Sequence, residues 1–236
     1  MKKQVPNIIT LLNLTSGCIA TVMAFNGDFQ MAFLWIVVAA VFDFFDGLAA
    51  RLLGVSSKLG VELDSLADVV SFGVAPSIAI FILLRDFTVL PEQLLPIQNL
   101  IPYFAFLIPA FSAYRLAKFN IDERQTTSFL GLPTPANGLF WISYAFGMQN
   151  PIGDNNLYLY LTLILIVVFS LLMVSEIPMF SLKMKSMGFK GNERQYILAA
   201  LILAFVILWG IAGIAWGIAG YILLSLTSGK KDKSFR

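Results

Sequence analysis

DFFDGLAARLLGVSSKLGVELDSLAD, residues 43–68, holds four aspartates in a chain otherwise made of long apolar runs: Asp43, Asp46, Asp64 and Asp68. Within each pair the two residues lie three or four positions apart, so on helices they stack on one face. Between the pairs, residues 51–60 contain glycines, serines and a lysine, which predicts a short polar turn between two helices. We therefore expect the chain to fold back here and to bring the two carboxylate pairs face to face.

Composition places these aspartates in a membrane protein. Of 236 residues, 58% are hydrophobic and 13% are charged, and the mean hydropathy is +0.81. A soluble domain carries about 25% charged residues. We expect an all-α, polytopic bundle of membrane helices. Apolar segments of spanning length occur at residues 7–26, 29–52, 61–84, 98–118, 131–149 and 156–180, followed by a long run at 195–226.

The run at 195–226 is too long for one ordinary span and short for two, and glycines crowd its middle. We divide the chain into a six-helix core at 1–180 and a C-terminal hydrophobic segment with a basic tail at 181–236. A hairpin in this segment would give eight spans and a single span would give seven. The hairpin is favoured because it leaves only Arg85 away from a cytoplasmic face rich in cations. The cations of that face would be Lys2, Lys3, Arg51, Lys58, Arg115, Lys118, Arg124, Lys183, Lys185, Lys190, Arg194, Lys230, Lys231, Lys233 and Arg236.

Grouped carboxylates in a membrane are costly, at roughly 2.5–3.5 kcal/mol for each Asp on insertion scales, and they repel one another. Oxygen ligands suit hard divalent cations such as Mg²⁺ or Mn²⁺, and four carboxylates can hold two of them. The chain has no histidine and one cysteine, Cys18, which excludes His-ligated zinc and an internal disulfide. Cys18 is expected to be a small buried packing residue. The alternative for the aspartates is that they cap helices or lie at the water interface.

The stretch read in full is Asp43-x2-Asp46-Gly47-x2-Ala50-Arg51-x8-Gly60-x3-Asp64-x3-Asp68. It matches every fixed position of the signature of the CDP-alcohol phosphatidyltransferases, integral-membrane enzymes of phospholipid synthesis, and the chain resembles that family. Three later blocks, DSLADVVSFGVAP, RLAKFN and FLGLPTPA, are similar to those that follow the signature in the phosphatidylserine synthase branch. The resemblance covers roughly residues 1–180.

The resemblance implies transfer of the phosphatidyl group of CDP-diacylglycerol to the hydroxyl of L-serine, giving phosphatidylserine and CMP, with two divalent cations (Mg²⁺ or Mn²⁺). Since the chain has no histidine, a carboxylate is the natural general base, and the resemblance places it at Asp68. Because the aspartates lie toward the cation-rich face, we expect an enzyme of the inner cell membrane whose site faces the cytoplasm. Its partners would be the two substrates, membrane lipids and a second copy of the chain, with no nucleic acid.

The resemblance also implies contacts between CDP-diacylglycerol and the positions Gly47, Arg51 and Ser57. Small or polar residues elsewhere are further candidates, because the first helix carries a polar stripe and a glycine lets a phosphate approach the backbone. These candidates are Asn7, Thr10, Asn13 and Gly60. For the stripe, hydrogen bonding between helices is an equal alternative.

For the acceptor, we expect Arg115 to hold the serine carboxylate, since its planar fork suits that group. Lys118, Ser71 and Gly73 complete the predicted serine site, and Gly73 with Pro76 indicates a local break in the helix. The alternative for the two cations is that they only reach toward the membrane surface.

The residues are also compatible with two other functions. The same chemistry could serve another acceptor, such as glycerol 3-phosphate, inositol phosphate or an amino-alcohol. The few cations near the site favour an uncharged or zwitterionic acceptor. A divalent-cation transporter could also use the aspartates, but Arg51 and Lys58 beside them suit phosphate better than passing cations.

Overall fold

The structure is a computed structural model that describes residues 4–87, 91–121, 129–149, 156–179 and 192–228. The described chain is almost entirely helical. Its longer helices are α1 (Gln4–Phe25), α2 (Phe29–Leu53), α3 (Lys58–Asp68), α4 (Ala75–Arg85), α5 (Leu107–Ile121), α6 (Thr134–Gly147), α7 (Asn156–Val174), α8 (Glu193–Trp209) and α9 (Gly213–Ser228). Shorter elements are the π-helix η1 (Val69–Val74), the 3₁₀ turns η2 (Glu92–Ile97), η3 (Ile101–Phe106) and η4 (Gly210–Ala212), and the two-residue strands β1 (Phe129–Leu130) and β2 (Pro178–Met179).

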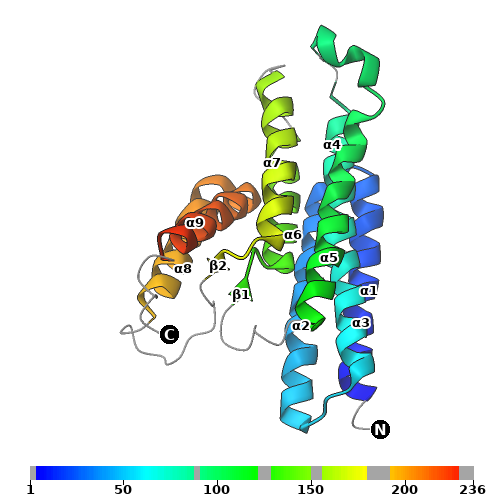
Figure 1. The fold of residues 1–236 in the computed structure, drawn as a ribbon, viewed down its shortest axis with the longest axis vertical. Helices are drawn as coiled ribbons and strands as arrows, with labels where there is room; N and C mark the ends of the chain where they lie inside the picture. Colours follow the sequence, from blue (N-terminus) through cyan, green and yellow to red (C-terminus); the bar gives the residue numbers. More distant parts are fainter. Residues whose placement is uncertain (1–3, 88–90, 122–128, 150–155, 180–191, 229–236) are drawn as a thin grey trace.

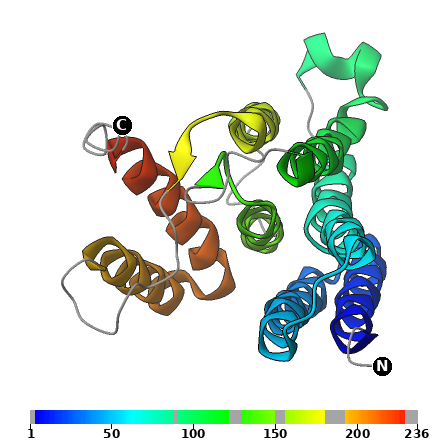
Figure 2. The same ribbon diagram turned by 60° about the horizontal axis from the view of Figure 1, so that its bottom comes forward.

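The helices α1 to α7 form a bundle with roughly parallel axes, and α8 and α9 lie obliquely beside it (Figure 1). Helix α1 packs on α2, α3 and α4, while α6 packs on α2, α4 and η1. Viewed toward the end of the bundle, α8 and α9 lie on the side of α6 and α7, away from α1 to α3 (Figure 2). The all-α membrane bundle predicted from the sequence is confirmed, and the one pairing of strands in the described residues joins Phe129 to Met179.

The bundle buries small and polar residues and exposes large apolar ones. In α1 the buried side is formed by Pro6, Thr10, Asn13, Ser16, Gly17, Ala20 and Ala24. The opposite side exposes Val5, Ile8, Leu11, Leu12, Val22 and Phe25. Such a distribution is typical of helices that pack closely through small residues and face lipid with large ones. Cys18 belongs to the exposed side, so its predicted burial is wrong: it lies beside Gly17 but off the small-residue face.

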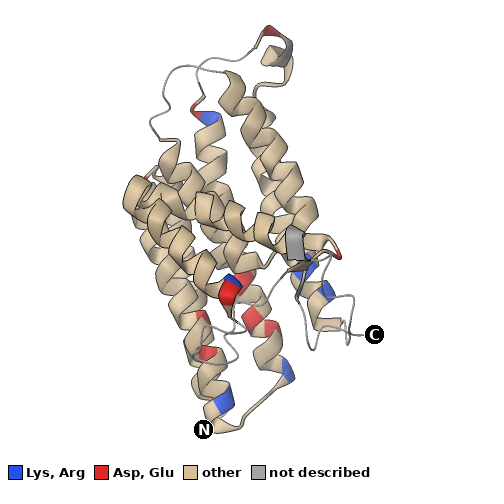
Figure 3. Ribbon diagram, turned by 90° about the vertical axis from the view of Figure 1, so that its left-hand side faces the viewer, with Lys and Arg blue, Asp and Glu red and all other residues tan. Residues whose placement is uncertain are grey.

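Five helical stretches among the described residues are long and apolar enough to cross a membrane: Gln4–Phe25, Phe29–Leu53, Lys58–Arg85, Asn156–Val174 and Glu193–Leu226. Helix α6 has 14 residues and is shorter than the segment expected at 131–149, because it begins only after Pro133 and ends at Gly147. Most cations used to predict the orientation lie outside the described residues. Among those described, Arg85 pairs with Asp86 at the far end of α4, while Lys and Arg gather in the half that holds both chain ends (Figure 3).

The turn between α2 and α3 has the residues that such a turn requires. Gly54 ends α2 with a φ of 60°, a left-handed conformation that glycine adopts without strain. Ser57 begins α3, and its hydroxyl accepts a hydrogen bond from the Gly60 amide at 3.0 Å. The predicted fold-back between the two aspartate pairs is confirmed.

The C-terminal run is a helical hairpin. Helix α8 ends at Gly210, which has a φ of 58°, and the chain returns as α9. The glycines of α9 meet α8 in reverse order, with Gly213 against Phe205, Gly217 against Ile202 and Gly220 against Leu201. Each helix has 16 or 17 residues, fewer than the about 20 of a full span, so the count of eight crossings stays a prediction. The predicted boundary at residues 180 and 181 lies outside the described residues.

At the centre of the bundle, α6 approaches η1 closely through Gly138. A Cβ at Gly138 would lie 2.7 Å from the carbonyl oxygen of Phe72 and 2.8 Å from its Cα. Because both are backbone atoms, Gly138→Ala is expected to push α6 away from η1 and to destabilise the protein by about 1–3 kcal/mol. Thermal unfolding in detergent would show a lower melting temperature. Val168→Ile adds one carbon on the exposed side of α7 and should leave the melting temperature unchanged; equal values for both variants would contradict the close contact.

Candidate functional site

Three of the four aspartates meet at one point. Asp43 from α2 and Asp64 and Asp68 from α3 each offer a carboxylate oxygen within 4.8 Å of the others. Asp43 and Asp64 are half-buried, and Asp68 is 7% exposed. The helical spacing that stacks each pair, together with the turn at Gly54 to Ser57, produces this cluster.

The fourth aspartate and the polar stripe of α1 complete the surroundings of the cluster. Thr10 Oγ1 donates a hydrogen bond of 2.6 Å to Asp46 Oδ2, and Asn13 Nδ2 donates one of 3.4 Å to Asp68 Oδ1. Thr10 therefore makes the bond between helices and also lines the cavity described below, while its contact with CDP-diacylglycerol stays a prediction. Asp46 faces α1 and lies outside the group of three.

The donor set fits a hard divalent cation. The Oδ1 atom of Asp64 is buried and has no hydrogen-bond partner, which leaves an acceptor free for a ligand. In the part of the chain that the structure describes, no Lys or Arg lies within ion-pair distance of the cluster. Neighbouring carboxylates without a balancing cation repel one another, and oxygen-only ligands are those preferred by Mg²⁺ and Mn²⁺.

The π-helix η1 follows directly after Asp68 and positions Asn13. Ser71 Oγ lies 2.7 Å from Asn13 Oδ1, to which it donates, and 3.1 Å from the Asn13 carbonyl oxygen. This bond holds the amide so that its Nδ2 faces Asp68. Gly17 allows the contact, since a Cβ there would meet the Oγ and the Cα of Ser71. The sequence indicated a break near Gly73 and Pro76, and the structure has its π-helix there.

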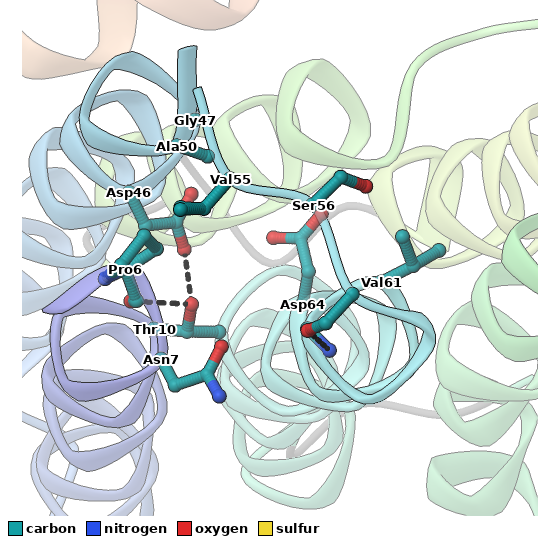
Figure 4. A pocket seen from close by; sticks show the side chains of 12 residues that line it. Pro6, Asn7, Thr10, Asp46, Gly47, Ala50, Val55, Ser56, Val61 and Asp64 are labelled. Atoms are coloured by element: carbon teal, nitrogen blue, oxygen red, sulfur yellow. Dashed lines mark hydrogen bonds between the residues drawn. The ribbon is translucent and has the colours of Figure 1, made fainter. Parts of the chain in front are cut away.

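A cavity with about 560 Å³ of empty space, part of it open to solvent, lies between α1, α2 and α3 beside the cluster (Figure 4). Asp46 and Asp64 lie on opposite sides of it. Of the residues predicted to contact CDP-diacylglycerol, the following line it: Asn7, Thr10, Gly47, Ser57 and Gly60. Val55 and Ser56, in the turn, also line it and were missed, although their place between two predicted contact positions could have indicated them.

The two glycines keep this cavity open. A Cβ at Gly60 would lie 3.1 Å from Ser57 Oγ and 3.2 Å from Asn7 Oδ1. A Cβ at Gly47 would lie 3.5 Å from Arg51 Nη1, so the exposed Arg51 folds back over Gly47. Asn13 is fully buried and is not among the lining residues; its amide bonds to Asp68 instead.

The predicted acceptor residues divide into two groups. Arg115 is 8% exposed and interacts electrostatically with Asp68, and its Nη1 donates a 3.2 Å hydrogen bond to Thr134 Oγ1. Lys118 lines a second, smaller cavity together with Arg115. Ser71 and Gly73 instead lie in helix contacts, Ser71 on Asn13 and Gly73 against Pro109 and Ser112. The serine-binding role of all four stays a prediction.

Two contacts of Arg115 were not found from the sequence. Thr134 begins α6 within the block FLGLPTPA, which we singled out without assigning a role to the threonine. Tyr221 in α9 is 3% exposed and interacts electrostatically with Arg115. It lies in a segment without a recognisable motif, and only the packing of α9 on α6 brings it there.

The fold and the site together define a class: a polytopic membrane protein with a carboxylate cluster and an adjoining cavity at one end of its helices. The family model described as CDP-alcohol phosphatidyltransferase matches residues 3–224. The chain belongs to the CDP-alcohol phosphatidyltransferase family.

Curated relatives narrow the comparison. The chain is 34% identical over 207 residues to the CDP-diacylglycerol--serine O-phosphatidyltransferase of Helicobacter pylori (strain ATCC 700392 / 26695), covering 85% of this chain and 80% of the relative. It is 34% identical over 148 residues to the protein of that name from Bacillus subtilis (strain 168), covering 63% and 78%. It is 33% identical over 132 residues to the archaetidylserine synthase of Methanothermobacter thermautotrophicus, covering 55% and 52%.

Proposed function

We propose that this enzyme transfers the phosphatidyl group of CDP-diacylglycerol to the hydroxyl of L-serine, forming phosphatidylserine and CMP. The observation that carries the proposal is the cluster of Asp43, Asp64 and Asp68 beside a cavity lined by small and polar residues. The names of the similar curated proteins support serine as the acceptor.

The carboxylates of Asp43, Asp64 and Asp68, with Asp46 next to them, would hold two divalent cations. Bound there, such cations supply charge neutralisation for the diphosphate and a fixed orientation for its displacement. Around that point, Asn7, Gly47, Ser57 and Gly60 form the cavity in which the cytidine diphosphate part of the donor would lie. The absence of side chains at the two glycines allows phosphate oxygens to approach the backbone.

The chain's own residues would then handle the acceptor. Asp68 takes the proton from the serine hydroxyl as its oxygen attacks the β-phosphorus. The bond between that phosphorus and the oxygen bridging to the α-phosphorus breaks, and CMP leaves with that oxygen. Asn13, held by Ser71, orients the Asp68 carboxylate through its amide. The burial of Asp68 keeps bulk water from competing with serine.

The competing acceptors differ in charge. A phosphorylated acceptor needs several cations, whereas the described residues next to Asp68 provide Arg115 and, further along α5, Lys118. A divalent-cation transporter is disfavoured by the cavity, whose glycines and serines suit a phosphate ester. Release of CMP from CDP-diacylglycerol, measured separately with L-serine, glycerol 3-phosphate, inositol phosphate, ethanolamine and no acceptor, tests the proposal. CMP release should require L-serine. CMP release with a phosphorylated acceptor and not with L-serine would overturn the proposal.

We also propose that the site faces the cytoplasm from the inner cell membrane and that the enzyme is a homodimer. The cytoplasmic orientation is supported by Arg51, Lys58 and Lys118, which lie on the side of the aspartate cluster, while Arg85 is at the far end of α4. The homodimer is supported by family resemblance.

Arg115→Ala is expected to raise the KM for serine by about 10- to 100-fold, because a charge-assisted bond to a carboxylate contributes about 1.5–3 kcal/mol. The KM for CDP-diacylglycerol should change far less. Steady-state CMP release with each substrate varied in turn measures both values. Arg85→Ala, which removes an exposed cation paired with Asp86, should change neither. An equal loss for both substrates in Arg115→Ala would remove Arg115 from acceptor binding.

A further inference from the structure

A second cavity lies where the C-terminal ends of α5 and α7 meet β1. It is far smaller than the cavity beside Asp46 and Asp64. Arg115 and Lys118 line it from α5, Leu130 from β1, and Val174 and Ser175 from the end of α7. The larger cavity therefore adjoins carboxylates and the smaller one adjoins cations.

On the cationic side of the small cavity, the buried Arg115 has no anion paired with it among the described residues. Arg115 is more than nine-tenths buried, and its Nε has no hydrogen-bond partner. Buried donors are nearly always paired, and a buried cation without a bonded carboxylate is costly. Arg115 interacts electrostatically with Asp68, but no ion pair joins them. A ligand carboxylate at Arg115 would satisfy the guanidinium and lie next to the carboxylate cluster.

The opposite side of the small cavity is apolar and firmly held. The Ser175 hydroxyl donates to the Leu172 carbonyl at 2.8 Å, so it is already used. Backbone bonds from Gly131 to Ile177 (2.9 Å) and from Leu132 to Leu172 (3.0 Å) fix the end of α7 to the chain after β1. Gly131, with a φ of 73°, also lies directly against the Met173 carbonyl. Because the backbone here is locked, the width of the cavity depends on the side chains that line it.

We propose that Val174, with Leu130, is the wall that selects the acceptor by size. The ligand is a small zwitterionic amino acid with a hydroxyl group: its carboxylate binds Arg115 and Lys118, and its carbon skeleton packs against Val174. This proposal rests on the proposed function and adds a specificity-determining residue outside the signature.

The first test narrows the cavity. Val174→Phe should raise the KM for L-serine by at least about tenfold, because the larger side chain would occupy space that the substrate needs. The KM for CDP-diacylglycerol should stay within about twofold of the value for the unmodified protein. Val168→Phe makes the same change on the lipid-facing side of α7, where Val168 is 42% exposed, and should alter neither value.

The second test widens the cavity and works even if Val174→Phe fails to fold. Val174→Ala should raise kcat/KM for L-homoserine relative to L-serine by at least about threefold, since homoserine is longer by one methylene. If the unmodified protein releases no CMP with serine, the proposed function fails. If it does, and Val174→Ala leaves the ratio unchanged, the selecting wall is overturned. A folded Val174→Phe that changes the KM of both substrates equally, or of neither, would also overturn it.

Discussion

Asp68→Asn is expected to lower turnover by about 10²- to 10⁴-fold, the contribution typical of a general base. Asparagine has the shape of aspartate, so it can still accept the hydrogen bond from Asn13, but it cannot take a proton from the acceptor hydroxyl. CMP release at saturating CDP-diacylglycerol and serine measures the loss. Binding of CDP-diacylglycerol, followed as a ligand-dependent rise in melting temperature, should be retained in part.

The control for this variant is Asp86→Asn, which removes an exposed carboxylate at the opposite end of the α3–α4 segment. It should keep full turnover. Asp68→Asn with more than about a tenth of normal turnover would take the base role away from Asp68. Complete loss of CDP-diacylglycerol binding would instead give Asp68 a role only in holding the cations.

Some parts of the site around Asp68 could be predicted from the sequence and others could not. The aspartate cluster was predictable because two local features produce it: helical spacing within each pair, and a glycine–serine turn between the pairs. Gly54 and Ser57 fix that turn through backbone conformation and a single capping bond. Short-range rules of this kind do not depend on the rest of the fold, so they can be applied to the sequence alone.

Contacts set by packing between distant helices were not predictable in the same way. The hydroxyl of Ser71 bonds to Asn13, 58 residues earlier in the chain, a contact that the sequence did not indicate, and its predicted serine-binding role stays a prediction. No local pattern distinguishes a hydroxyl facing a ligand from one facing a neighbouring helix. The same holds for Tyr221, which reaches Arg115 only because α9 returns along α8 and packs on α6. Cys18 adds a further case, since one position along α1 separates the bundle-facing Gly17 from the exposed face.

Chelation of divalent cations is expected to lower turnover by more than about 10³-fold, and added Mg²⁺ or Mn²⁺ should restore it, because without cations the clustered carboxylates would repel the diphosphate. Asp43→Asn should raise the cation concentration needed for half-maximal turnover by at least about tenfold.

Stability provides a readout that does not depend on turnover. Removing one of three mutually repelling carboxylates should make cation-free Asp43→Asn melt at a higher temperature than the cation-free parent. The parent should gain more when the cation is added, by about 2.7 kcal/mol at a hundred times its Kd. As the cation is titrated, the parent should therefore change from the lower to the higher melting temperature of the two proteins. Melting temperatures that respond equally in both, with activity indifferent to chelation, would mean that Asp43 and its neighbours hold no cation.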